Sequence, residues 1–270
     1  MKSSSDSGAS PTVFGVRLRQ IPSEENVRAL CEAFLDDGGT HCIFTPNPEI
    51  LLYARKHPDY AALLNDGDLI LPDGFGIVLV DFLRRGRSIS RWAGIDVADL
   101  ILRLAADRGA PVMFVGGQGG SGERAAARWR ARTPGLDVVT AADAVPFRED
   151  GTAVLSSHES RLEEQIQETQ PAVIFVALGH PKQERWIARH RRSIPSARIL
   201  MGVGGTLDMW AGRFSRAPRL LRSIGLEWLW RLGQDPARLP RVLRATLEFP
   251  LLALIDRGAA RGPGPQAAKR

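Results

Sequence analysis

Short apolar runs rich in Val and Ile recur along the chain, with amphipathic stretches between them. Runs of this length are typical of buried strands, and a helical spacing of apolar positions is typical of the helices that connect parallel strands. The pattern predicts an α/β protein with a mainly parallel sheet and flanking helices. The expected strands cover residues 13–18, 42–45, 69–71, 112–115, 138–140, 173–178 and 199–203.

The helix signals divide the chain into a core and a tail. Pro48 follows Asn47 as the first residue of one helix, and Gly109 ends another over residues 96–108. After Gly212 no strand candidate appears. We therefore expect an α/β core over residues 13–212 and a helical, basic appendage over residues 213–256. The ends, residues 1–12 and 257–270, are expected to be disordered.

Composition supports a folded protein, since 44% of the residues are hydrophobic and 24% are charged. The net charge of +6 is segregated, because residues 213–270 hold 12 Lys and Arg against 4 Asp and Glu. Such a tail suits phosphate in nucleic acid, in anionic lipid or in a ligand. No apolar run approaches the roughly 20 residues that a membrane span needs. Residues 1–12 resemble neither a signal peptide nor an anchor, so we expect a cytoplasmic protein, peripheral on the inner face of the cell membrane.

Polar residues follow two of the predicted strands, where ligands bind in open parallel sheets. Asp73 comes directly after residues 69–71 and is placed to act as a general base, although Asp before Gly is also ordinary turn chemistry. Thr45 and Asn47 lie at the end of the strand at 42–45, on backbone stiffened by Pro46 and Pro48. They suit substrate positioning, and Asn47 is equally an ordinary helix N-cap.

Glycine-rich loops follow three further strands. Gly116 and Gly117 open the pattern Gly117-x-Gly119-x-x-Gly122, which favours a phosphate at a helix N-terminus. A dinucleotide site would also need an acidic residue closing the next strand; Asp137 precedes that strand and Asp143 comes late. The block at 179–184 places Lys182, Gln183 and Glu184 in a first helical turn, where Lys182 and the amides suit an anion. The last loop contains Gly202, Gly204, Gly205 and Asp208.

Metal and disulfide chemistry have little support in the sequence. The only Asp-x-Asp triplet, Asp66-Gly67-Asp68, precedes a strand instead of following one, and the two cysteines, Cys31 and Cys42, have no ligand spacing. We expect both cysteines to be small buried apolar residues. If no metal neutralises a leaving diphosphate, arginines must do so, and the tail supplies them.

Four blocks in order resemble the WecG/TagA/CpsF family of bacterial glycosyltransferases, over roughly residues 13–245. The last block leads into Arg216-Ala217-Pro218 and Gly225-Leu226-Glu227-Trp228. The ordered set is much more specific than any one block. The blocks are Thr45-Pro-Asn47-Pro-Glu49, Pro72-Asp73-Gly74-Phe-Gly76, Gly179-His-Pro181-Lys182-Gln183-Glu184 and Gly202-Val-Gly204-Gly205-Thr206-Leu-Asp208.

The resemblance implies a Rossmann-like fold with a C-terminal helical appendage. It also implies transfer of a sugar from a UDP-sugar to a saccharide on polyprenyl diphosphate, in the synthesis of surface polysaccharides such as exopolysaccharide or teichoic acid. Inversion at the anomeric carbon and no metal cofactor are expected. Carried over from the family, the residues of the site are Asp73 as base, Thr45, Asn47 and Arg91 beside it, Gln183 and Asp208 in the pocket, and Arg231, Arg238 and Arg241 over the diphosphate.

One residue departs from the family pattern, because His180 stands where small residues are usual. Two other classes of function stay open from the residues alone: an NAD(P)-dependent oxidoreductase, on the glycine pattern, and a nucleic-acid-binding protein, on the tail with Trp228 and Trp230. We expect no nucleic-acid partner. The sequence leaves open the donor sugar, the acceptor saccharide and the oligomeric state, a homo-oligomer included.

Overall fold

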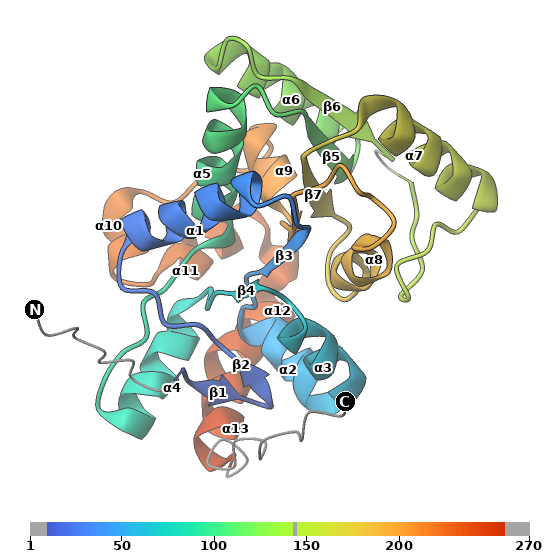
Figure 1. Ribbon diagram of the computed structural model, residues 1–270. Coiled ribbons are helices and arrows are strands. Elements are labelled where there is room, and N and C mark those ends of the chain that lie inside the picture. The colour runs from blue at the N-terminus through green and yellow to red at the C-terminus, as the bar shows by residue number, and fades with distance from the viewer. Residues whose placement is uncertain (1–9, 143–144, 257–270) are drawn as a thin grey trace, which may run out of the picture.

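The computed structural model describes residues 10–142 and 145–256 (Figure 1). Its centre is a six-stranded sheet in which all strand pairs are parallel, as the sequence predicted. The order across the sheet is β4-β3-β8-β7-β5-β6. The strands are β3 His41–Phe44, β4 Leu69–Ile70, β5 Val112–Gly116, β6 Val138–Ala141, β7 Val173–Ala177 and β8 Ile199–Gly202.

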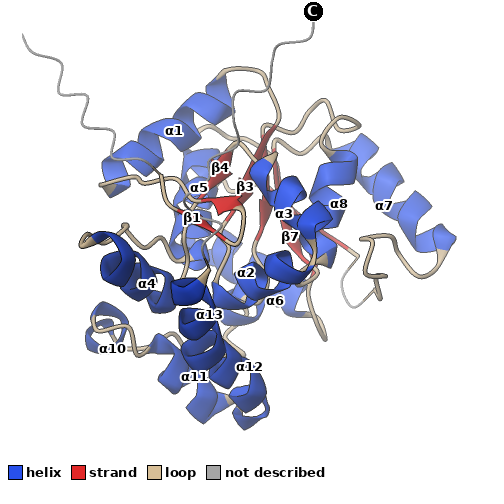
Figure 2. Ribbon diagram, turned by 90° about the horizontal axis from the view of Figure 1, so that it is seen from below, coloured by secondary structure: helices blue, strands red, loops and turns tan. Residues whose placement is uncertain are grey.

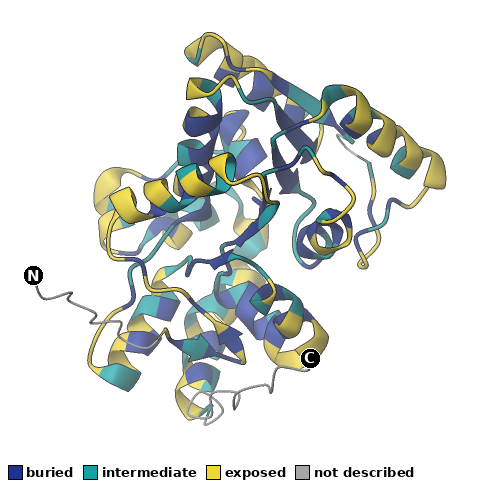
Figure 3. Cartoon of the chain, viewed as in Figure 1, coloured by how far each residue is buried: buried dark blue, intermediate teal, exposed yellow. Residues whose placement is uncertain are grey.

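Helices cover both faces of this sheet and give the three layers of a Rossmann-like fold. Side chains alternate along each strand, so that Cys42 and Phe44 enter the core on one face while Ile43 enters the core on the other. The strands are almost completely buried between these layers (Figure 3). The helices are α1 Glu24–Asp36, α2 Pro48–Lys56, α3 Pro58–Asn65, α4 Phe75–Arg85, α5 Gly94–Asp107, α6 Ser121–Arg132, α7 Ser156–Thr169, α8 Lys182–His190 and α9 Thr206–Trp210.

Both cysteines lie in these cores, Cys31 on α1 and Cys42 on β3. Burial raises the pKa of each thiol to about 12, so both stay protonated near neutral pH. The interpretation of the cysteines as small buried residues is confirmed.

The prediction of a single strand over residues 13–18 was wrong. These residues form a separate antiparallel hairpin of β1 Thr12–Val13 and β2 Val16–Arg17. Phe14 and Gly15 turn the chain with positive φ angles of 49° and 81°. The side chain of Asn65 fixes the hairpin to α3, because it accepts from the Arg17 N–H at 2.8 Å and donates to the Gly15 carbonyl at 2.7 Å.

The expected disordered leader, residues 1–12, is shorter than predicted. Pro11 is buried and its carbonyl accepts from the Leu18 N–H at 2.8 Å, so folded structure begins before the predicted start at residue 13. Residues 1–9 and the expected disordered end at 257–270 lie outside the described residues.

The tail is helical, as expected, and it packs on the core (Figure 2). Phe249 and Ala253 on its last helix are fully buried against α4 and α2, and the Phe249 ring meets Phe14 of the hairpin edge-on at 5.9 Å. The tail is therefore part of the folded body. Its elements are α10 Arg219–Ser223, α11 Glu227–Gln234, the 3₁₀ turn η1 Pro236–Arg238, α12 Leu239–Leu243, the π turn η2 Arg244–Glu248 and α13 Phe249–Ile255.

Candidate active site

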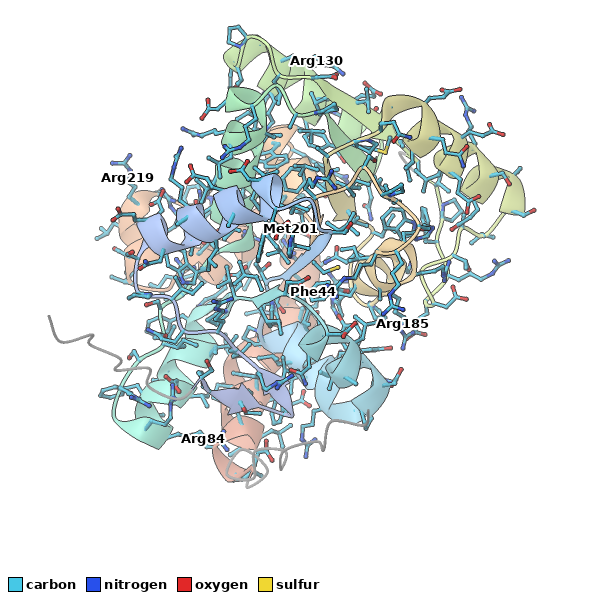
Figure 4. All side chains as sticks on the ribbon, viewed as in Figure 1. Phe44, Arg84, Arg130, Arg185, Met201 and Arg219 are labelled. Atoms are coloured by element: carbon cyan, nitrogen blue, oxygen red, sulfur yellow. The ribbon has the colours of Figure 1, made fainter. Side chains whose placement is uncertain are left out.

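A cavity of about 540 Å³ lies at the carboxyl ends of β4, β3, β8 and β7, between the core and the tail. Phe44 and Met201, labelled in Figure 4, are strand residues just ahead of two of its loops. Strands β3 and β8 are neighbours in the sheet although they are far apart in the chain, and ligands commonly bind at such a change in strand order. The predicted site residues that line the cavity are Thr45, Asn47, Asp73, Arg91, Gln183, Gly202, Gly204, Gly205, Arg231, Arg238 and Arg241.

Asp73 is held on the cavity wall by backbone contacts on both sides. Its N–H donates to the Pro46 carbonyl at 3.0 Å, and its Oδ2 accepts from the Gly94 N–H at 3.2 Å. Burial raises the pKa of the Asp73 carboxyl, against the opposing effects of the Gly94 N–H, Arg231 and Arg91. A carboxylate with a raised pKa is a better proton acceptor, so this geometry suits a general base.

Thr45 and Asn47 stand beside Asp73, on the loop that leaves β3. Asn47 is the N-cap of α2, because its Oδ1 accepts from the Ile50 N–H at 3.0 Å. The cap interpretation is therefore confirmed, and among residues 10–142 and 145–256 the side-chain Nδ2 has no hydrogen-bond partner. Gly94 allows the close approach of Thr45, since a Cβ there would lie 2.6 Å from the Thr45 Oγ1.

Gln183 shapes the glycine loop after β8. It is buried, and its Oε1 accepts from the Gly204 N–H at 3.0 Å while its Nε2 donates to Glu184 at 2.7 Å. A Cβ at Gly202 would lie 2.8 Å from the Gln183 Nε2, so a larger residue would displace this amide. His180 lines the cavity nearby and meets the Tyr53 ring edge-on at 6.0 Å.

Three arginines of the tail face the cavity. Arg238 is half-buried, and burial together with the positive charges of Arg231 and Arg241 lowers its pKa. Within the part of the chain that the structure describes, no carboxylate lies within ion-pair distance of Arg238. Arg231 and Arg241 each pair with one glutamate, so the three arginines together keep an excess positive charge that suits a diphosphate.

Glu227 is a site residue that the sequence reasoning quoted only within a family block and did not assign to the site. It is buried on the cavity wall, 2.9 Å from Arg231 Nη2 and 3.8 Å from Arg91 Nη1. The Glu227 carboxylate of the tail therefore pairs with Arg91 of the core and with Arg231 of the tail. The available signal was the spacing of Glu227 four residues before Arg231, which places the two side chains on one helical face.

Five predicted residues lie away from the cavity lining: Gly116, Gly117, Lys182, Glu184 and Asp208. The Gly117 N–H donates to the Ala177 carbonyl at 3.3 Å, and a Cβ at Gly116 would meet the same oxygen at 3.0 Å. These glycines pack the end of β5 against β7. Glu184 is a buried residue of α8, where burial raises the pKa of its carboxyl, and Asp208 pairs with Arg213 at 3.6 Å where the tail begins.

Two acidic residues considered for dinucleotide or metal binding, Asp137 and Asp68, make contacts that stabilise the fold. Asp137 precedes β6 with its carbonyl accepting from the Val112 N–H at 2.9 Å, and Asp143 lies outside the described residues. Asp68 accepts from the Cys42 N–H at 2.8 Å and pairs with Arg191 at 2.8 Å. The loop of Asp66 and Asp68 thus braces β3, as expected of a structural loop.

Comparison with known proteins identifies a family for this chain. Residues 11–262 match the sequence model of the Glycosyl transferase WecG/TagA/CpsF family. The chain is 33% identical to a Bacillus spizizenii protein named N-acetylglucosaminyldiphosphoundecaprenol N-acetyl-beta-D-mannosaminyltransferase, over 78% of this chain and 77% of the relative. Proteins of the same name from Bacillus subtilis and Staphylococcus aureus are also 33% identical, with 74% of both chains covered.

Proposed function

Because the chain belongs to the WecG/TagA/CpsF family of glycosyltransferases, we propose that it transfers a sugar from a UDP-sugar to a saccharide on polyprenyl diphosphate. The observation that carries this proposal is one cavity in which Asp73 and three tail arginines stand together. The relatives' name describes an acceptor of this kind, N-acetylglucosamine on diphosphoundecaprenol. The product would serve the synthesis of a surface polysaccharide.

In the proposed reaction, Asp73 accepts the proton of an acceptor hydroxyl as its oxygen attacks the anomeric carbon. The new carbon–oxygen bond forms as the bond to the UDP oxygen breaks, and UDP leaves with the electron pair. Arg231, Arg238 and Arg241 neutralise the departing diphosphate. Thr45, Asn47 and Gln183 orient the sugar and the glycine loop beside it.

A single displacement of this kind inverts the anomeric carbon. Retention by double displacement would need a second carboxylate about 5 Å from the first, free to act as a nucleophile. The other carboxylates of the lining, Glu49 and Glu227, are paired with Arg241 at 3.5 Å and Arg231 at 2.9 Å. These pairs support inversion.

We propose further that no metal is needed, because arginines occupy the position where a metal would offset diphosphate charge. Turnover should be the same with EDTA as without it. Activity that disappears with EDTA and returns with Mn²⁺ or Mg²⁺ would contradict this part of the proposal.

The membrane is the proposed location of the acceptor, and the inner face of the cell membrane is the proposed location of the enzyme. No helix of the described residues is long and apolar enough to cross a bilayer. The tail's arginines near an anionic leaflet would contribute about 1 kcal/mol each, and interfacial Trp adds anchoring. This charge-dependent part of binding should weaken as salt rises.

Neither alternative class gains support from the geometry. The Gly117 N–H donates to the Ala177 carbonyl of β7, so this amide is not directed at a cofactor, which weighs against the dinucleotide alternative. Three tail arginines face the cavity and Arg216 pairs with Asp96, so four of the tail's arginines have places within this molecule, which weighs against the nucleic-acid alternative.

The test is UDP release, measured with a panel of donors and a saccharide–diphosphate–polyprenyl acceptor. UDP-N-acetylmannosamine is the first donor to try, given the relatives' names, with UDP-glucose, UDP-glucuronate and UDP-N-acetylglucosamine beside it. Acceptor-dependent release from one donor would establish class and donor together. No acceptor-dependent release from any UDP-sugar would overturn the proposed function.

A further inference from the structure

Glu184 is a buried acidic residue next to the cavity that the proposed reaction does not use. It lies in the first turn of α8, is 2% exposed and does not line the cavity. Burial raises the pKa of its carboxyl. A buried carboxyl destabilises a fold unless it is hydrogen-bonded, so its contacts indicate its role. Any effect of Glu184 on a ligand must pass through a neighbouring side chain.

The neighbour is Gln183, whose amide bridges Glu184 and the glycine loop after β8, residues 202–205. The Gln183 Nε2 donates to Glu184 Oε1 at 2.7 Å, and the Gln183 Oε1 accepts from the Gly204 N–H at 3.0 Å. Consecutive residues of a helix normally point in different directions. Here both side chains are buried and their polar ends meet, so one amide carries a hydrogen bond at each end.

The glycine loop depends on this amide for one of its own backbone groups. The N–H groups of Val203 and Thr206 donate to backbone carbonyls, at 2.9 Å and 3.1 Å. The Gly204 N–H donates instead to the Gln183 side chain, and Gly204 has a φ of 51°, in the left-handed region. Residues 202–205 all line the cavity. A shift of Gln183 would therefore move a wall of the cavity.

The bridge works in one orientation of the amide. The Gly204 N–H can only donate, so the Gln183 Oε1 faces it and the Nε2 faces Glu184. A carboxyl oxygen accepts from the Nε2 whether the acid is ionised or neutral. Without an acceptor at position 184, the buried Nε2 would lose this hydrogen bond. An unpaired buried donor is costly, so the amide would turn away and release the Gly204 N–H.

We propose that Glu184 is a positioning residue: its carboxyl fixes the Gln183 amide, and the amide fixes the glycine loop in the shape that binds the UDP-sugar. The inference rests on the proposed function for its substrate and adds a residue to that site. Glu184 does not touch the substrate. Its contribution passes through Gln183, so it should disappear when Gln183 is replaced.

The first test asks whether position 184 needs an acceptor or only a side chain of the right size. Glu184→Met keeps an unbranched side chain and removes the carboxyl, and kcat/KM for the UDP-sugar should fall about tenfold. Glu184→Gln keeps an acceptor oxygen and should recover most of this loss. Equal losses in the two variants would overturn the proposal. Thermal unfolding checks that each variant folds, and Glu184→Leu replaces Glu184→Met if the latter does not.

Tyr60→Phe is the matched control, because the Tyr60 hydroxyl of α3 is another buried polar group that acts on the Glu184 carboxyl. Its removal leaves the hydrogen bond between Glu184 and Gln183 in place. The kcat/KM of Tyr60→Phe should stay within about twofold of wild type. A loss as large as that of Glu184→Met would mean that any disturbance of this buried cluster suffices, and would overturn the proposal.

The second test combines Glu184→Met with Gln183→Ala. Gln183→Ala alone should lower kcat/KM by about tenfold or more. In the Gln183→Ala protein, the further change Glu184→Met should alter kcat/KM by less than about twofold, because the amide through which Glu184 acts is gone. Losses that multiply in the double variant would mean that Glu184 acts through another contact, and the proposal would then be wrong.

Hydrogen exchange tests the same contact without catalysis. In a peptide that covers residues 202–206, exchange of the Gly204 amide should become about tenfold faster in Glu184→Met and in Gln183→Ala, and should keep the wild-type rate in Tyr60→Phe. The amides of β7 serve as the internal reference. Unchanged exchange of the loop in Glu184→Met, or equally faster exchange in β7, would overturn the positioning role.

The exchange measurement separates this inference from the proposed function. A wild-type protein without acceptor-dependent UDP release would overturn the proposed function. The exchange rates of the loop would then still decide whether Glu184 fixes it through Gln183.

Discussion

At the scale of single residues, the site depends on how Asp73 is surrounded. Its carboxylate accepts a hydrogen bond from the Gly94 N–H. The charges of Arg91, Arg231 and Glu227 also act on it. Burial disfavours the charged carboxylate and raises its pKa, and the arginines partly reverse this. The position of Asp73 after its strand could be predicted from the sequence. The balance of charges around it could not, because Arg91, Glu227 and Arg231 come from distant segments.

Replacing Asp73 with Asn should lower kcat by about 10² to 10⁴-fold while UDP affinity changes little. A general base acts in the transition state and is not needed to hold the nucleotide. Steady-state kinetics and UDP titration measure the two effects. Wild-type turnover would remove Asp73 from the mechanism, and lost UDP affinity with little change in kcat would assign it to the donor site instead.

Replacing Glu227 with Gln should shift the acidic limb of the pH profile of kcat/KM to lower pH. The negative charge of Glu227 raises the pKa of Asp73, so its removal lowers that pKa and leaves the base ionised at lower pH. Activity at neutral pH should fall by less than about tenfold, since Glu227 acts through Asp73 and the arginines and does not itself take part in the proposed proton transfer.

Asp96→Asn is the matched control for this profile, because Asp96 pairs with the tail residue Arg216 outside the cavity lining. Its acidic limb should stay where the wild-type limb is. A Glu227→Gln profile that falls equally at every pH would mean a structural role only.

At the scale of elements, the site is assembled by close approaches that only small residues permit. Gly94 begins α5 against the Thr45 side chain, and Gly202 ends β8 against the Gln183 amide. The sequence indicated Gly202 as a site residue because it belongs to the glycine-rich loop after the strand at 199–203. Nothing in the local pattern marked Gly94, since a glycine at a helix start is ordinary and its neighbour Thr45 is 49 residues away.

Replacing Gly94 with Ala should lower kcat/KM at least about tenfold and cost about 1–3 kcal/mol of stability. The added Cβ would lie 2.6 Å from the Thr45 Oγ1 and displace the loop beside Asp73. Gly233→Ala is the control, because no atom lies within 4 Å of a Cβ there. Kinetics and thermal unfolding of both variants measure the effect; equal kinetics would show that the loop adjusts without loss.

At the scale of the whole molecule, the tail is a wall of the cavity and a part of the core. Its arginines complete the site, and Phe249 and Ala253 complete the apolar core on one face of the sheet. Removing residues 213–270 would therefore remove a wall of the cavity and part of the core. Point variants are the sharper test of each role.

Phe249→Ala should lower the free energy of unfolding by about 3–5 kcal/mol, because Phe249 is fully buried and its loss leaves a cavity beside Phe14. Leu251→Ala, two residues along the same helix and 64% exposed, should change it by less than about 0.5 kcal/mol. Urea unfolding compares them. Similar small losses in both would mean that the tail folds apart from the core.

The sequence by itself determined the strands of the parallel sheet, the helices between them and the polar loops that follow β3, β4, β7 and β8. Apolar periodicity and turn residues are local properties, and a local pattern predicts them well. The local pattern gave the wrong prediction at residues 13–18, which form a hairpin fixed by Asn65 of α3.

Only the tertiary structure decided which loops share the cavity. Strand order places β3 beside β8 and β5 farther away, so Thr45 and Gly202 line one cavity while Gly116 and Gly117 pack elsewhere. It also brought Arg91 of the core to Glu227 and Arg231 of the tail. Such contacts depend on packing between segments over a hundred residues apart, which no local pattern in one sequence records.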